Sequence, residues 1–95
     1  MAKKDLLFIT VIGRDMKGIV ARVSQLLFRE SINIDDISQK VIEGFFVMTM
    51  LVDMTGSRTS LDRLRAALEK LGAKMKLRIQ VQHSNVFKAM HRVSP

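Results

Sequence analysis

The sequence predicts an α+β fold with the element order β-α-β-β-α-β, and three observations lead to it. Hydrophobic residues alternate with polar ones in some stretches, as in strands, and recur every three or four residues in others, as in helices. Glycines separate these stretches. The 95 residues, 47% of them hydrophobic, have room for one domain with a core of its own.

The predicted first strand and first helix flank a polar loop. Residues 5–12 are rich in β-branched and aromatic residues and end before Gly13, a pattern typical of a strand. After the loop at residues 14–18, apolar residues follow a helical period from residue 19 to about residue 31. The apolar stripe of this helix consists of Ile19, Val20, Val23, Leu26 and Leu27.

The next two strands are predicted to form a hairpin. Residues 32–34 alternate, and residues 37–41 alternate with the opposite parity, so we expect a β-bulge around Asp35–Asp36. Glu43–Gly44 is a two-residue turn signal between apolar runs. Residues 45–53 are apolar at both parities, which predicts a central strand covered on both faces.

The second helix is expected after a loop at residues 55–58. Thr59 or Ser60 can cap its start, and Gly72 stands where its C-terminal cap is expected. Its buried stripe consists of Leu61, Leu64, Leu68 and Leu71. A clean alternation of apolar and polar residues then predicts the last strand. Its apolar positions are Met75, Leu77, Ile79 and Val81.

Each predicted helix connects two strands of the sheet by a crossover. Two such β-α-β connections predict a ferredoxin-like sandwich in which residues 1–95 form a single domain. Its four-stranded antiparallel sheet has the strand order 4-1-3-2, with both helices on one face. Residues 1–4 are an N-terminal lead, and residues 84–95 are expected to form a short C-terminal helix. The face without helices should carry apolar side chains at its centre, which favours a homodimer or ligand binding there.

Composition excludes several kinds of site. Without cysteine the chain has no disulfide framework, no cysteine-ligated zinc and no thiol nucleophile. No stretch approaches the roughly 20 apolar residues of a membrane span, so we expect a cytoplasmic protein with no membrane partner and no cofactor. His83 and His91 have no metal-ligand spacing. In a regular strand the carboxylates of Asp35–Asp36 point to opposite faces, but the expected bulge relaxes this restriction, so the pair remains a candidate ligand contact. We therefore predict neither an enzyme nor a metal site.

The loop between the first strand and the first helix is the best candidate for a ligand site. Free backbone N–H groups and the positive end of the helix dipole converge there, which suits a carboxylate or a phosphate. The candidate ligand-binding residues of this loop and helix start are Arg14, Asp15, Lys17, Gly18, Ile19 and Val20. The alternative is an ordinary turn in which glycine supplies a positive φ and Asp15 caps the helix.

RNA-recognition domains share this order of strands and helices, and the net charge of +7 keeps RNA binding as the alternative function. Residues 7–9 resemble the start of their first-strand signature, and residues 44–47 resemble their third-strand signature. However, Glu43 stands where a basic residue is required. Phe45 and Val47 share a face, so at most one of the two stacking aromatics is present.

The segment V-I-G-R-D-M-K-G-I-V-A-R-V at residues 11–23, followed by I-N-I-D-D-I-S-Q at residues 32–39, resembles the ACT domain. More narrowly, it resembles the small stand-alone bacterial and archaeal ACT proteins related to the glycine-cleavage repressor regulators. Residues 43–53 resemble the third strand of that family, and residues 87–93 its terminal segment. The resemblance implies a non-enzymatic regulatory protein that binds a small molecule, typically an amino acid, at a dimer interface.

The resemblance also implies roles for individual residues. By position, Gly18 matches the loop glycine beside the ligand, and Asp15 matches the polar residue before it. Asn33 matches an asparagine that contacts the effector in some members. Lys17 stands where many relatives have proline, which favours a more acidic effector. Many ACT domains only dimerise, so a dimerisation module without ligand remains an alternative.

The charge is unevenly distributed along the chain. Residues 57–83 carry a net charge of +5, whereas residues 32–56 carry −3. This polarity favours oriented self-association or an acidic protein partner over a uniform nucleic-acid surface.

Overall fold

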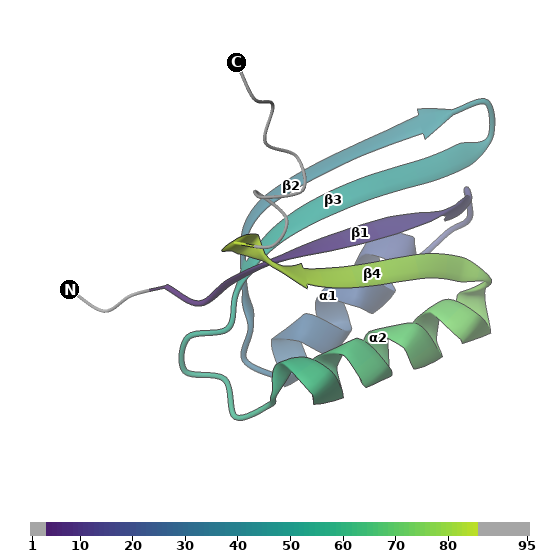
Figure 1. The fold of residues 1–95 in the computed structure, drawn as a ribbon. Helices are drawn as coiled ribbons and strands as arrows, with labels where there is room; N and C mark the ends of the chain where they lie inside the picture. Colours follow the sequence, from purple (N-terminus) through teal and green to yellow (C-terminus); the bar gives the residue numbers. More distant parts are fainter. Residues whose placement is uncertain (1–3, 86–95) are drawn as a thin grey trace, which may run out of the picture.

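The computed structural model describes residues 4–85, and its elements follow the predicted order (Figure 1). They are β1 (Leu6–Arg14), α1 (Ile19–Arg29), β2 (Asn33–Ile42), β3 (Phe45–Asp53), α2 (Leu61–Met75) and β4 (Leu77–His83). The antiparallel sheet has the order β2-β3-β1-β4, which is the predicted order read from the other edge. Both helices cover the same face of the sheet (Figure 1), so the predicted ferredoxin-like fold is confirmed.

The core lies between the sheet and the helices and takes one parity of each central strand. In β1, Leu7, Ile9 and Val11 are buried, and the residues between them face the other side of the sheet. The central positions of β1 and β3 are therefore as predicted. The predicted cover on the second face of these strands is incomplete in the described part of the chain, because Ile12 is 44% exposed and Phe45 is 48% exposed.

The hairpin and its bulge lie where the sequence predicts them. The register between β2 and β3 shifts between Ile34 and Asp36. Ile34 and Ile37 therefore both face the helix side, although they differ in parity. At the turn, Glu43 has a φ of 50° and Gly44 a φ of 82°, as a two-residue hairpin with two left-handed positions requires.

The predicted end of the second helix is wrong. Ser60 caps the start of α2 as expected, but the helix continues through Gly72 to Met75, so Met75 is not a strand residue. The C-cap is Lys76, in the left-handed region with a φ of 57°. Gly72 is needed for close contact with β4, because a Cβ there would lie 2.7 Å from the carbonyl oxygen of Leu77.

The first strand is also longer than predicted. Gly13 does not end it, because this residue pairs with β3 on one side and β4 on the other, and the strand continues to Arg14. The C-terminal helix predicted over residues 84–95 lies, from residue 86 onwards, outside the described residues. Between residues 4 and 85, no helix is long and apolar enough to cross a membrane.

Candidate functional site

The loop after β1 is held in place by backbone hydrogen bonds. The N–H of Asp15 donates to the carbonyl oxygen of Gly44 at 2.9 Å, which ties the loop to the β2–β3 turn. Gly18 has a φ of 88°, and its carbonyl oxygen accepts the first helical hydrogen bond from the N–H of Arg22 at 2.9 Å. A Cβ at Gly18 would meet nothing within 4 Å, so glycine is needed here for its conformation and not for space.

Helix α1 begins without a side-chain cap. No side chain accepts a hydrogen bond at its N-terminus, and no acidic residue stands in its first turn. The ordinary-turn alternative is therefore right about the positive φ of Gly18 but wrong about a cap from Asp15. The first-turn amides and the positive end of the helix dipole are left without a side-chain acceptor, an arrangement that suits an anion.

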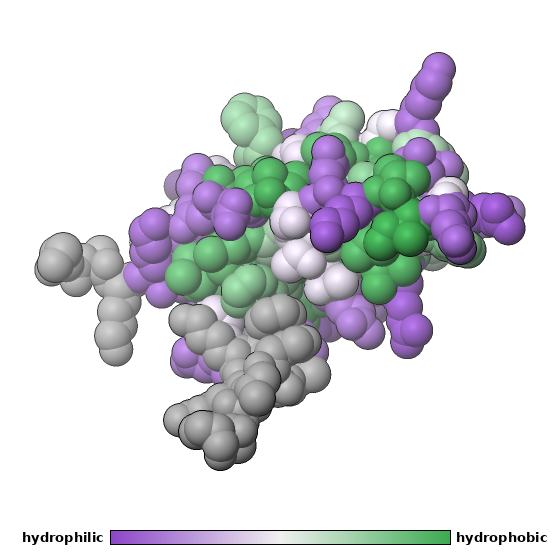
Figure 2. Space-filling view, turned by 90° about the horizontal axis from the view of Figure 1, so that it is seen from above, coloured by the Kyte–Doolittle hydropathy of each residue, from purple (hydrophilic) through white to green (hydrophobic). Residues whose placement is uncertain are grey.

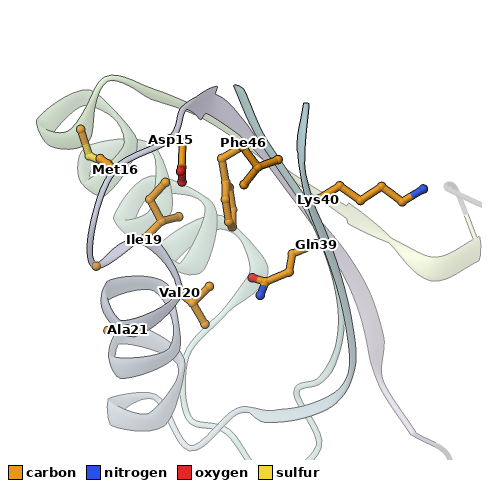
Figure 3. Close-up of a pocket in the computed structure, with 10 residues that line it drawn as sticks. Asp15, Met16, Ile19, Val20, Ala21, Gln39, Lys40 and Phe46 are labelled. Atoms are coloured by element: carbon orange, nitrogen blue, oxygen red, sulfur yellow. The ribbon is translucent and has the colours of Figure 1, made fainter. Parts of the chain in front are cut away.

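This helix start borders a cavity of about 460 Å³ between α1 and the hairpin strands (Figure 3). Its lining residues are Asp15, Met16, Gly18, Ile19, Val20, Ala21, Gln39, Lys40, Val41 and Phe46. Val20, Gln39 and Phe46 point toward one another across it, whereas the side chain of Lys40 points away (Figure 3). Apolar walls with a few polar groups are typical of small-molecule sites.

The structure brings some of the predicted site residues together and separates others. Those that line the cavity are Asp15, Gly18, Ile19 and Val20. Arg14 ends β1 on the uncovered face of the sheet, where its guanidinium carbon lies 5.7 Å from the centre of the Phe45 ring. Lys17 is exposed and does not line the cavity.

Asn33 begins β2 at the opposite end of the sheet. It pairs with Asp53, seven residues further along β3 than Phe46, a separation of about 23 Å. The side-chain amide of Asn33 donates to Asp35 Oδ1 at 2.7 Å, and Lys4 Nζ lies 2.9 Å from Asp35 Oδ2. Within one chain Asn33 therefore does not reach the cavity, and its contact with a ligand stays a prediction for a neighbouring chain.

Hydrogen bonds at this distant end of the sheet lower the pKa values of two carboxyl groups. The pKa of Asp35 is lowered chiefly by the hydrogen bond from Lys4 and then by the one from Asn33. The pKa of Asp53 is lowered chiefly by the hydroxyl of Thr55, which donates at 2.7 Å. Asp35 lies near the start of β2 and Asp53 at the end of β3, and neither lines the cavity.

His83 ends β4, and its Nε2 lies 3.4 Å from Asp5 Oδ1. Among residues 4–85 there is no group of three or more histidine, cysteine or acidic side chains that could hold a metal ion. His91 lies outside the described residues.

The strand side of the cavity was missed by sequence reasoning. Gln39, Val41 and Phe46 form this wall, and none of them was a candidate. A signal existed, because the turn at Glu43–Gly44 sets the hairpin register and pairs Val41 with Phe46. The same register pairs Gln39 with Met48, so Gln39 and Val41 both lie on the helix side.

Residues 5–82 match the family model of the ACT domain. A UPF0237 protein of Methanococcus maripaludis is 48% identical over 85 residues, which cover 90% of this chain and 94% of that protein. A UPF0237 protein of Methanopyrus kandleri is 46% identical over 85 residues, with the same coverage of both chains.

Solved structures agree with this match. The ACT domain protein from Streptococcus pneumoniae has a TM-score of 0.79 and 35% identity, covering 94% of this chain and all of that one. The ligand-free regulatory subunit of aspartate kinase from Thermus thermophilus has a TM-score of 0.64 and 28% identity, covering 82% of this chain and 51% of that one. A β-α-β-β-α-β sandwich, a glycine-led helix start and these matches agree: the chain belongs to the ACT domain family.

Proposed function

We propose that this protein is a regulatory module without enzymatic activity that binds a small carboxylate, most simply an amino acid, in the cavity beside Gly18. One observation carries the proposal: an uncapped helix start borders a cavity of about 460 Å³. The effector carboxylate accepts hydrogen bonds from the amides of residues 18–20. The side chain of the effector packs between Val20 and Phe46, which line the same cavity.

A second copy of the chain completes this site by pairing along β2. β2 is an edge strand, and an edge presents N–H and C=O groups that a second strand can pair. On its helix side, Ile37 is 40% exposed and Val41 is 57% exposed. An antiparallel pairing of the two β2 edges moves Asn33 of the second copy toward the turn at Glu43–Gly44, which the loop of the site contacts. The predicted ligand contact of Asn33 is then made between chains.

A thermal-shift screen across the amino acids and related carboxylic and phosphoric acids tests the site. A ligand present at 100 times its Kd stabilises the protein by about 2.7 kcal/mol. Gly18→Asp places a carboxylate where the effector anion binds, so we expect it to abolish the shift. If no compound shifts the transition, or if Gly18→Asp leaves a shift intact, the proposed site is wrong.

Gly56→Asp is the matched control. Gly56 has a φ of 84°, close to the 88° of Gly18, and a Cβ at either position meets nothing within 4 Å. Both variants therefore carry a similar backbone strain and the same added charge. Since Gly56 does not line the cavity, its variant should keep the ligand-induced shift.

The acidic protein partner predicted from the charge fits the helix layer. A groove of about 250 Å³ between α1 and α2 contains four cationic side chains from both helices. They are Arg22, Arg29, Lys70 and Lys74. This groove leaves the effector cavity free, so an acidic partner bound there can respond to the effector without competing for its site.

The register of the sheet weighs against RNA binding, the alternative function. Phe8 pairs with Leu51, six residues along β3 from Phe45, so the two aromatic positions lie about 20 Å apart. Sheets that read RNA stack bases on aromatic residues in neighbouring positions. A dimer that ignores every compound in the screen would support the remaining alternative, a dimerisation module without ligand.

A further inference from the structure

Among residues 4–85, both helices lie on one face of the sheet, and the other face, called the uncovered face below, has a regular pattern. Antiparallel pairing places its side chains in rows that run across the four strands. The central row is polar and consists of Ser38, Thr49, Thr10 and Gln80. The row on one side consists of Lys40, Val47, Ile12 and Arg78. The row on the other side consists of Asp36, Leu51, Phe8 and Gln82.

This pattern places two apolar areas on either side of a polar band. In both flanking rows the apolar residues stand on the central strands, and the polar ones stand on the edge strands. Figure 2 looks onto this face and shows apolar side chains gathered in two areas with paler residues between them. On β2 the two flanking rows end in opposite charges, Lys40 and Asp36.

The three central rows of the face are complementary to those of a second copy. A rotation of 180° about the central row exchanges the two flanking rows, so each apolar area of one copy lies over the other apolar area of its partner. In this arrangement Val47 lies over Leu51 of the second copy, and Lys40 lies over Asp36. The central polar row meets itself, with Thr10 over Thr10.

We propose that the uncovered face is a two-fold interface between two copies of this chain, with its axis along the row through Ser38, Thr49, Thr10 and Gln80. The two sheets pack with aligned strands, as the sheets of a β-sandwich do. An axis parallel to the strands would also bring the faces together. It would place β2 over β4, however, and so oppose Lys40 with Arg78 in the same row.

The area of the face is in the range that a stable interface needs. Four strands about 30 Å long at a spacing of about 4.8 Å cover roughly 570 Å² in projection, and side chains raise the accessible area above that value. A standard interface buries about 800 Å² of accessible surface on each partner. The interface goes beyond the proposed function, because it uses neither the effector cavity nor the edge pairing of β2.

The oligomeric mass of one surface variant tests the interface. Ile12 is 44% exposed at the centre of one apolar area, and Ile12→Lys would bury a charge against an apolar surface. We expect sedimentation velocity to show half of the wild-type mass for Ile12→Lys. Phe28→Lys is the control, since Phe28 is 81% exposed on α1, and it should keep the wild-type mass.

The outcomes of this experiment separate the two proposed associations. An Ile12→Lys variant with the full wild-type mass overturns the interface on the sheet face alone, whereas a wild-type protein with the mass of one chain overturns both this interface and the edge pairing of β2. The ligand-induced thermal shift of Ile12→Lys should equal that of the wild type. An Ile12→Lys variant that has half of the wild-type mass but the same ligand-induced thermal shift therefore shows that this interface is separate from the effector site.

The direction of the axis is tested by mixing variants. Val47→Glu alone should halve the mass, because it opposes Leu51 with a charge. Mixing it with Leu51→Lys should restore the full mass through a heterodimer in which Glu and Lys meet. Mixing Val47→Glu with Ile12→Lys should not restore the full mass, since Ile12 of one copy lies over Val47 of the other only when the axis runs along the strands. Restoration by Ile12→Lys in place of Leu51→Lys would overturn the proposed axis.

A second pair of variants covers the case in which these half-buried positions do not tolerate charge. Asp36 and Lys40 are both exposed, so Asp36→Lys and Lys40→Glu leave the core intact. Each variant alone opposes like charges and should weaken the assembly, and a mixture of the two should restore it. If the mixture does not restore the mass, the proposed arrangement, in which β2 of one copy lies face to face over β2 of the other, is overturned.

Discussion

At position 72 a Cβ atom would lie 2.7 Å from the carbonyl oxygen of Leu77, and a backbone atom cannot move aside cheaply. Alanine favours a helix over glycine by about 1 kcal/mol, but overpacking costs about 1–3 kcal/mol. We therefore expect Gly72→Ala to lower the free energy of unfolding by up to about 2 kcal/mol, measured by urea denaturation. Ala66→Gly, at an exposed position of the same helix, measures the propensity alone. A Gly72→Ala variant more stable than the wild type would contradict this packing.

Asp53 makes the stability of the fold depend on pH. Its carboxylate accepts hydrogen bonds from the hydroxyl and the N–H of Thr55, at 2.7 and 2.9 Å, which hold its pKa below the ordinary value of 3.8. A lowered folded-state pKa stabilises the fold above the ordinary value, and this contribution is lost as the pH falls through the folded-state pKa.

Thr55→Val removes the largest cause of that shift. We expect the variant to unfold at a lower temperature than the wild type above pH 3.8, and the difference should narrow as the pH falls below that value. A pH series of thermal unfolding curves measures it. Thr59→Val, at a half-buried position of the same connection, should show a difference that does not change with pH.

The two helices begin in different ways, and the difference separates stability from function. The hydroxyl of Ser60 accepts a hydrogen bond from the N–H of Arg63 at 3.1 Å, so α2 is capped, whereas α1 is not. We expect Ser60→Ala to lower the free energy of unfolding by about 1 kcal/mol in chemical denaturation. The ligand-induced thermal shift should be unchanged. An altered shift would show that α2 takes part in the effector site.

Elements with local signals could be predicted from the sequence. The hairpin turn needs two residues that accept a positive φ, and Glu43–Gly44 supplies them. The bulge follows from a change of parity around Asp35–Asp36. The end of α2 could not be predicted, because Gly72 looks like a local cap and its role depends on contact with Leu77, a residue of another element.

The candidate site divides in the same way. Its loop half could be predicted, since the conformation of Gly18 and the uncapped amides that follow it are properties of adjacent residues. Its strand half depends on the register of the hairpin, which brings Val41 and Phe46 beside the helix. The distance of Asn33 from the cavity depends on the full length of β2, which a motif match does not contain.

On the scale of the whole molecule, association should make thermal stability depend on concentration. Partners that bind only the folded chain raise its unfolding temperature by mass action. We expect the Tm of the wild type to rise over a dilution series spanning about two orders of magnitude, measured by calorimetry. The rise should be smaller for Ile12→Lys and unchanged for Phe28→Lys. A wild-type Tm that does not depend on concentration would contradict self-association.

Net charge alone does not describe this molecule. The acidic segment 32–56 forms β2 and β3, and the basic segment 57–83 forms α2 and β4, so the polarity runs across the sheet. On the uncovered face, however, the charges of Asp36 and Lys40 cancel within β2. Segment charge therefore influences long-range approach, whereas the rows of the face determine which orientation fits.

The hydrogen bond from the N–H of Asp15 to the carbonyl oxygen of Gly44 involves main-chain atoms only. Any residue except proline can donate it, so the side chains of this loop, apart from the glycine required at position 18, can be exchanged during evolution without moving the backbone that carries them. Duplicated copies of such a gene could diverge in what they sense while keeping the same frame. A loop fastened in this way allows new specificities to arise by single substitutions.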